Sequence, residues 1–82
     1  MPFCYILYSK ARDKFYIGHT EHTVSERLAK HLSNHDGFTA KAKDWQIAWA
    51  MEFEEKVDAH AMERKIKAWK SRKAIENLIQ GP

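Results

Sequence analysis

Five side chains of this sequence combine groups that transfer protons with groups that stabilise negative charge. Two of them are the phenols of Tyr5 and Tyr16, which have ten residues between them. Arg27 and His31 follow four positions apart, a spacing that places both on one face of a helix. A carboxylate, Glu63, comes much later in the chain. We expect the five groups to converge at the edge of a small sheet.

Three apolar runs are typical of strands and would carry both phenols. Residues 3–8 are rich in aromatic and branched side chains, and residues 15–17 form a shorter run that Gly18 stops. Residues 46–53 alternate large apolar side chains with small or polar ones at a period of two. The polar stretch 9–14 has a suitable length for a hairpin loop, so the first two strands should be antiparallel.

Helical patterns fill the rest of the chain. Residues 23–26 match a capping box, which predicts a helix that begins near Val24 and ends at residues 34–37. Its apolar positions recur every four residues and leave Arg27 and His31 at the margins of the buried stripe. A second helix should start near Asp58, and Ser71 should cap a short third helix.

The predicted order is therefore β-β-α-β-α-α. The economical architecture for this order is an α+β fold, with a small three-stranded antiparallel sheet flanked by helices. A chain of 82 residues allows one domain, so we expect residues 1–82 to form a single domain. This length excludes Rossmann and barrel enzymes and any large cleft between domains.

Composition narrows the class of protein further. The only cysteine, Cys4, lies in the first apolar run, so we expect a buried thiol and no intrachain disulfide. No apolar stretch is long enough to span a bilayer, and no signal-type segment begins the chain. We therefore expect no membrane partner and a cytoplasmic location. The net charge of +3 permits a nucleic-acid partner without establishing one.

The ordered set of chemical groups resembles the GIY-YIG endonuclease superfamily over about residues 3–79. The resemblance rests on Tyr5, the segment 16–18 (Tyr-Ile-Gly), Arg27, His31 and Glu63 at family-like spacing. Residues 37–41 and 63–67 look like the small stand-alone members, which are similar to the N-terminal nuclease domain of the excision-repair subunit UvrC. The first motif departs from the family because it reads Phe-Cys-Tyr in place of Gly-Ile-Tyr, although its tyrosine is kept.

The resemblance implies a metal-dependent endonuclease that hydrolyses DNA phosphodiester bonds. One Mg2+ or Mn2+ would be held by Glu63, and Arg27 would neutralise the scissile phosphate. Tyr5 and Tyr16 would position or activate the attacking water, and His31 would relay a proton or bind phosphate. Substrate preference would be for DNA structure rather than sequence, with a recruiting protein as a further possible partner. Asn77 is the candidate for an asparagine that family members often carry after the acidic helix.

Basic side chains gather late in the sequence and suggest a surface for DNA phosphates. Six of the ten residues from 64 to 73 are Lys or Arg. Such a run is also typical of a solvated helix face, and both interpretations stay open. The predicted nucleic-acid-binding residues are Lys41, Lys67, Lys70, Arg72 and Lys73.

Each proposed site residue also has a purely structural interpretation. The tyrosines could be ordinary strand aromatics, and Glu63 forms an i,i+4 pair with Lys67. Four histidines between residues 19 and 35 could suggest zinc, but neither an HExxH pattern nor a second cysteine accompanies them. The alternative function is a non-catalytic or partner-dependent nucleic-acid-binding module of the same fold. The sequence leaves open which tyrosine is the base, the physiological substrate and the oligomeric state.

Overall fold

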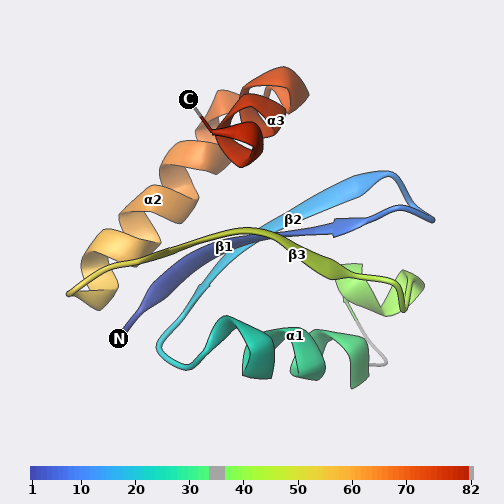
Figure 1. Ribbon diagram of the computed structural model, residues 1–82, viewed down its shortest axis with the longest axis horizontal. Coiled ribbons are helices and arrows are strands. Elements are labelled where there is room, and N and C mark those ends of the chain that lie inside the picture. The colour runs from blue at the N-terminus through green and yellow to red at the C-terminus, as the bar shows by residue number, and fades with distance from the viewer. Residues whose placement is uncertain (34–36, 82) are drawn as a thin grey trace.

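The computed structural model describes residues 1–33 and 37–81 (Figure 1). The elements follow the predicted order β-β-α-β-α-α, with one additional 3-10 turn after the first helix. Their bounds are β1 Phe3–Ser9, β2 Lys14–Thr20, α1 Val24–Ser33, η1 Phe38–Lys41, β3 Gln46–Glu52, α2 Lys56–Trp69 and α3 Arg72–Gln80.

The three strands form one antiparallel sheet in the order β2-β1-β3, with β1 in the centre. This arrangement confirms the α+β prediction. Side chains on β1 alternate between the two faces of the sheet, as in any strand. Tyr5 and Leu7 pack with Val24 of α1, whereas Cys4 and Ile6 pack against α2 and α3. The sheet therefore lies between a layer formed by α1 and a layer formed by α2 and α3 (Figure 1).

The first two strands are longer than the sequence suggests. Ser9 pairs with Lys14, so the connection spans residues 10–13 instead of 9–14. The side chain of Asp44 fixes this end of the hairpin, because it accepts hydrogen bonds from the Ser9 hydroxyl (2.6 Å) and the Ala11 amide (2.8 Å). The second strand also continues through Gly18 to Thr20, since Gly18 pairs opposite Tyr5 in the sheet.

Two of the three α-helices, α1 and α3, begin where the capping residues in the sequence predicted. The Thr23 hydroxyl accepts a hydrogen bond from the Glu26 amide at 3.1 Å, and α1 begins at Val24 as predicted. The Ser71 hydroxyl caps α3 in the same way. In contrast, α2 begins at Lys56, two residues before Asp58, because the Glu55 carbonyl already accepts the first helical hydrogen bonds. The predicted end of the first helix falls largely on residues 34–36, which lie outside the described residues.

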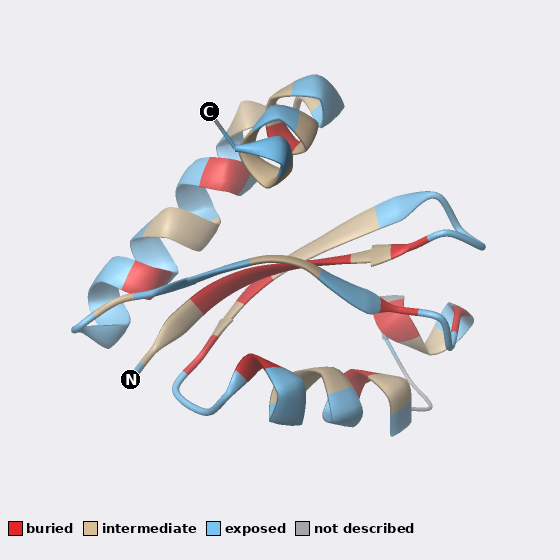
Figure 2. Cartoon of the chain, in the orientation of Figure 1, coloured by how far each residue is buried: buried red, intermediate tan, exposed pale blue. Residues whose placement is uncertain are grey.

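Burial is concentrated along the central strand and on the sheet-facing sides of the helices (Figure 2). Cys4 is fully buried, as predicted, and desolvation raises the pKa of its thiol to about 12. Trp45 is buried beside α1, while Trp49 and Trp69 pack against the core from the other face. None of the helices in the described part of the chain has the length and apolar character required to cross a membrane.

Candidate active site

Four of the five predicted site residues meet on the α1 face of the sheet. The Tyr5 hydroxyl lies 3.0 Å from Nε2 of His31, and Nε of Arg27 donates to the same hydroxyl at 3.4 Å. The ring of Tyr16 lies 4.7 Å from the His31 ring and 6.4 Å from the Tyr5 ring, measured between centroids. Two strands and one helix thus bring two phenols, a guanidinium and an imidazole into a single cluster.

The protein environment favours neutral forms of the two central groups. Tyr5 is 1 % exposed, and burial raises the pKa of its phenol, although the hydrogen bond from Arg27 opposes that shift. His31 is 7 % exposed, and burial lowers the pKa of its imidazole, as do the nearby charges of Arg27 and Lys30. At neutral pH the pair therefore consists of a protonated phenol and an uncharged imidazole.

Thr39 joins this cluster, although its role could not be recognised from the sequence pattern. Nδ1 of His31 lies 3.0 Å from the Thr39 hydroxyl oxygen, and the Thr39 backbone oxygen accepts a hydrogen bond from the Trp45 indole at 3.0 Å. Thr39 is only 2 % exposed. It lies in η1, outside the helix on which the periodic spacing placed Arg27 and His31, so no spacing rule connects it with them.

Gly18 provides the room in which the Tyr5 hydroxyl lies. The two residues are partners in the β1–β2 register. A Cβ atom on Gly18 would lie 2.6 Å from the Tyr5 hydroxyl oxygen and 2.8 Å from its ring carbon Cζ. These distances are too short for any real Cβ contact, and both atoms belong to a buried ring. The glycine at this position is therefore required by the phenol across the strand pair.

Replacing Gly18 by Ala is expected to displace the Tyr5 ring and destabilise the fold. The cost should be about 1–3 kcal/mol, as is typical of overpacking in a core, and it should appear as a lower thermal unfolding midpoint. Circular dichroism melts of the wild type and Gly18→Ala measure the effect. Gly81→Ala is unsuitable as a matched control because Gly81 has a positive φ of 80°. Ala29→Gly, at an exposed position of α1, tests instead whether an ordinary glycine–alanine difference explains the change.

The fifth residue, Glu63, lies in the other layer. Gly18 and His19 are consecutive on β2 and point to opposite faces, so His19 faces the α2–α3 layer. The Glu63 carboxylate, on α2, contacts Nδ1 of His19 at 2.5 Å and Nζ of Lys67 at 2.6 Å. The structure therefore places Glu63 beside β2, across this edge strand from Tyr5, rather than in direct contact with it. Its charge still contributes to the raised pKa of Tyr5.

The contacts of Glu63 keep it ionised. Partial burial raises the pKa of the carboxyl group, but hydrogen bonds from His19 and Lys67 outweigh that effect, and the net pKa is lowered. The i,i+4 pair with Lys67 is present as the sequence indicated. His19, which the sequence singled out only as a possible zinc ligand, is instead a partner of Glu63 and stacks on His60. Within residues 1–33 and 37–81, no three His, Cys, Asp or Glu side chains gather as a metal site.

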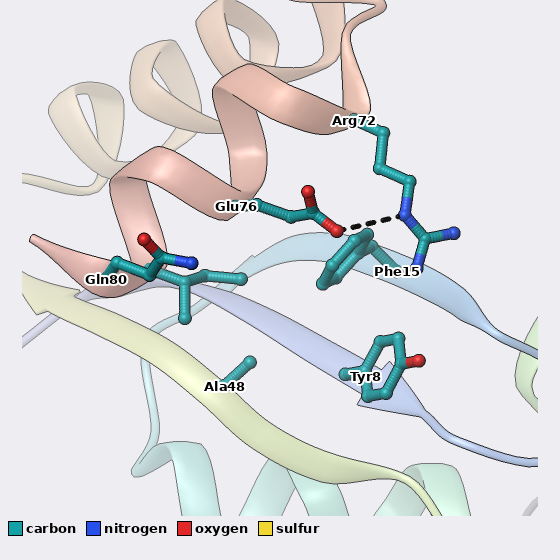
Figure 3. Close-up of a pocket in the computed structure, with 7 residues that line it drawn as sticks. Tyr8, Phe15, Ala48, Arg72, Glu76 and Gln80 are labelled. Carbon is teal, nitrogen blue, oxygen red and sulfur yellow. Dashed lines mark hydrogen bonds and ion pairs between the residues drawn. The ribbon is translucent and has the colours of Figure 1, made fainter.

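The predicted basic residues are exposed but differ in whether their charged groups already contact other side chains of the protein. Lys41 is on η1, and Lys70 and Lys73 lie where α2 meets α3. Arg72 is held within the protein, since its guanidinium pairs with Asp13 and Glu76 and lies 5.3 Å from the centre of the Phe15 ring. Arg72, Glu76 and Phe15 line a hollow of about 330 Å³ between α3 and the sheet (Figure 3), and none of the tyrosine-cluster residues lines it. Arg72 is thus less available to DNA than the lysines.

Comparison with known proteins agrees with this architecture. The family model described as the GIY-YIG catalytic domain matches residues 1–77. Searches of curated proteins and of solved structures gave no significant match. The narrower similarity to UvrC stays a prediction. Because the family model covers nearly the whole chain, and both motif tyrosines lie on neighbouring strands as described above, the chain belongs to the GIY-YIG family of nuclease domains.

Proposed function

We propose that this protein is a divalent-metal-dependent endonuclease that hydrolyses DNA phosphodiester bonds. The observation that carries the proposal is the Tyr5 hydroxyl, held between an uncharged imidazole and a guanidinium in a buried position. Phosphodiester hydrolysis requires a route for a proton from water and a positive group beside the phosphate. The Tyr5–His31–Arg27 arrangement supplies both.

In this proposal Tyr5 and His31 move the proton together. Tyr5 takes a proton from the attacking water as its own hydroxyl proton passes to Nε2 of His31, 3.0 Å away. Any negative charge that develops on the phenol oxygen is stabilised by Nε of Arg27. These contacts favour Tyr5 over Tyr16 as the proton-transferring phenol. Tyr16, whose ring lies against both Tyr5 and His31, would orient the water or contact the phosphate.

Arg27 would also bind the scissile phosphate. Among the described residues, its one side-chain hydrogen bond uses Nε, so both Nη groups remain for a phosphate oxygen. A planar guanidinium can hold two oxygens of one anion at the same time. One side chain could therefore stabilise the phenol oxygen and the phosphate together.

Glu63 has the chemistry required to hold a Mg2+ or Mn2+ ion. Its lowered pKa keeps it as a carboxylate, and hard divalent cations prefer oxygen ligands. A single carboxylate is enough because such ions retain several waters and also bind substrate phosphate. Lys67 would have to release one carboxylate oxygen, which its exposed amine can do at small cost. When bound, the cation would supply Lewis-acid stabilisation of the phosphate and the leaving oxygen.

DNA would be held through its backbone. Lys41, Lys67, Lys70 and Lys73 are exposed cations, and contacts from such residues to phosphate do not depend on base sequence. Arg72 would contribute only after releasing Asp13 and Glu76. We therefore propose that the protein recognises DNA structure rather than sequence.

Cleavage assays with an Arg27 variant test the proposal. Supercoiled, single-stranded and branched DNA are incubated with the protein and either Mg2+ or Mn2+, at DNA concentrations that saturate binding. Arg27→Ala should lose cleavage by at least about 100-fold, the scale of losing one charge-stabilising donor, whereas Arg12→Ala, an exposed residue of the hairpin loop, should cleave normally. Equal activity of Arg27→Ala, or no cleavage of any substrate with either metal, contradicts the proposal.

One observation favours a second function, a nucleic-acid-binding module without cleavage. Both oxygens of Glu63 already have partners, and the carboxylate lies across β2 from Tyr5. Such a module would bind DNA with an affinity that falls steeply as salt rises, and the affinity would survive Glu63→Ala. Binding of wild type and Glu63→Ala in the absence of metal, compared with their cleavage, distinguishes the two functions.

The rate of cleavage is expected to fall on the acid side of pH 6.5. His31 must be uncharged to accept a proton, and burial holds its pKa below the ordinary value of 6.5. Activity should therefore decline as pH falls through this lowered pKa, at a more acidic pH than for an unperturbed imidazole. The pH dependence of kcat/KM, which reports groups of the free enzyme, measures the midpoint, and a midpoint at or above 6.5 would contradict the assigned role. Protonation of Glu63 should not contribute to this decline, because the pKa of its carboxyl group is lowered from the ordinary value of 4.5.

A further inference from the structure

The hydrogen bonds around Tyr5 determine which nitrogen of His31 carries the proton. Among the described residues, the hydroxyl of Tyr5 has two partners, Nε of Arg27 and Nε2 of His31. A guanidinium only donates hydrogen bonds, so it cannot accept the Tyr5 proton. In the protein without substrate, where Tyr5 is 1 % exposed, the acceptor that the described residues provide for its proton is Nε2 of His31. An uncharged imidazole that accepts at Nε2 carries its hydrogen on Nδ1.

The Nδ1 hydrogen then points to Thr39. Nδ1 lies 3.0 Å from the Thr39 hydroxyl oxygen, which can accept from it while keeping its own hydrogen for another partner. Thr39 is itself anchored, since it is buried and its backbone oxygen accepts hydrogen bonds from the Trp45 indole and the Ala42 amide. The threonine hydroxyl is therefore a fixed acceptor behind the imidazole, on the side away from Tyr5.

From this geometry we propose that Thr39 is a positioning residue that holds His31 in the Nδ1–H tautomer, with Nε2 open toward the Tyr5 hydroxyl. In the other tautomer Nε2 would donate to Tyr5 and could not take its proton. The positioning itself is a property of the folded chain. Its consequence for catalysis rests on the proposed function, because it matters only if Tyr5 passes a proton to His31.

The alternative tautomer carries a structural penalty at the Tyr5 hydroxyl. If Nε2 carried the hydrogen, Tyr5 would face two donors, His31 and Arg27, and its own buried hydrogen would lose its acceptor. Leaving a buried donor unpaired is unfavourable, so the two contacts reinforce one another. Removing the Thr39 hydroxyl leaves Nδ1–H without a partner and should weaken the preference for this tautomer.

Nitrogen NMR of the wild-type protein tests the tautomer without any assay of activity. Uniformly 15N-labelled protein is measured near pH 7.5, and the His31 imidazole signals are assigned by their loss in His31→Gln. We expect a protonated Nδ1 and an unprotonated Nε2. Observation of the Nε2–H tautomer would overturn the proposal, whether or not the protein cleaves DNA.

Two substitutions test whether Thr39 is responsible. Thr39→Val keeps the shape of the side chain but removes the hydroxyl, whereas Thr39→Ser keeps the hydroxyl. In Thr39→Val we expect a mixed tautomer and a kcat reduced roughly 10-fold or more, with KM for DNA unchanged. Thr39→Ser should restore both properties. A wild-type tautomer in folded Thr39→Val would overturn the role of Thr39.

The two readouts separate this proposal from the nuclease assignment. Should the protein fail to cleave DNA, the tautomer populations of the wild type and the Thr39 variants still decide whether Thr39 positions His31. Should Thr39→Val not fold, judged by circular dichroism, Thr39→Ala provides the hydroxyl-free variant and the wild-type spectrum remains decisive. A loss of kcat with an unchanged tautomer would show that Thr39 acts in another way and would also overturn the proposal.

Discussion

Replacing Glu63 by Gln is expected to abolish metal-dependent cleavage while leaving DNA binding intact. The substitution preserves the shape of the side chain but removes the negative charge that would hold Mg2+ or Mn2+. In the proposed mechanism the phosphate and leaving oxygen would then lack the cation's charge stabilisation, so the rate should fall by at least about 100-fold. Affinity for DNA measured without metal should stay the same or rise slightly, because one negative charge is removed beside Lys67.

Glu52→Gln is a suitable control for this experiment. Glu52 is exposed at the end of β3, on the opposite edge of the sheet from β2. The Glu52→Gln variant should therefore cleave DNA at the wild-type rate. Isothermal titration with Mn2+ adds a measurement that is independent of catalysis, since Glu63→Gln should bind the ion more weakly than Glu52→Gln. If Glu63→Gln keeps full cleavage and its affinity for Mn2+, the metal-binding role of Glu63 is wrong.

The strong local patterns of the sequence were sufficient to predict the fold. Alternation along the third strand, the capping box at residues 23–26 and the helix cap at Ser71 gave element types and starts that the structure confirms. The hairpin was predicted with too long a loop because Asp44, thirty-five positions from Ser9, holds its end. A contact across that sequence distance leaves no signal in the local composition, so strand ends set by such contacts cannot be found from pattern alone.

The relative positions of site residues could be predicted where the residues lie on the same helix, because their spacing along the sequence determines which face they share. A separation of four placed Arg27 and His31 on one face of α1, and both contact the Tyr5 hydroxyl. Spacing within α2 could not show on which side of the sheet Glu63 would lie, because that depends on how the helix packs. Strand alternation could not supply this information either, because the predicted second strand ended at residue 17, whereas His19, the partner of Glu63, lies in the part of β2 that the prediction left out. Thr39 had no spacing signal because it lies in η1, outside the helix that carries Arg27 and His31.

Removal of a single hydroxyl group from Tyr5 should separate catalysis from folding and binding. In Tyr5→Phe the ring still fills its place in the core, but Nε2 of His31 and Nε of Arg27 lose their shared partner. We expect cleavage to fall by roughly 100-fold to 10,000-fold, the usual contribution of general acid–base catalysis. Stability should fall by about 1–3 kcal/mol, because buried polar groups lose a hydrogen bond. Cleavage rates at saturating DNA and thermal melts measure the two effects.

Tyr8→Phe provides a matched control on the same strand. The Tyr8 hydroxyl donates to Asp13 at 2.6 Å in an exposed contact, and its side chain lines the hollow beside α3 rather than the tyrosine cluster (Figure 3). Its loss should leave cleavage unchanged. Tyr16→Phe then distinguishes the two motif tyrosines, because the proposed proton transfer runs from the Tyr5 hydroxyl to His31. If Tyr16→Phe abolishes cleavage while Tyr5→Phe retains it, proton transfer runs through Tyr16, and the hydrogen bond between Tyr5 and His31 serves the structure of the core.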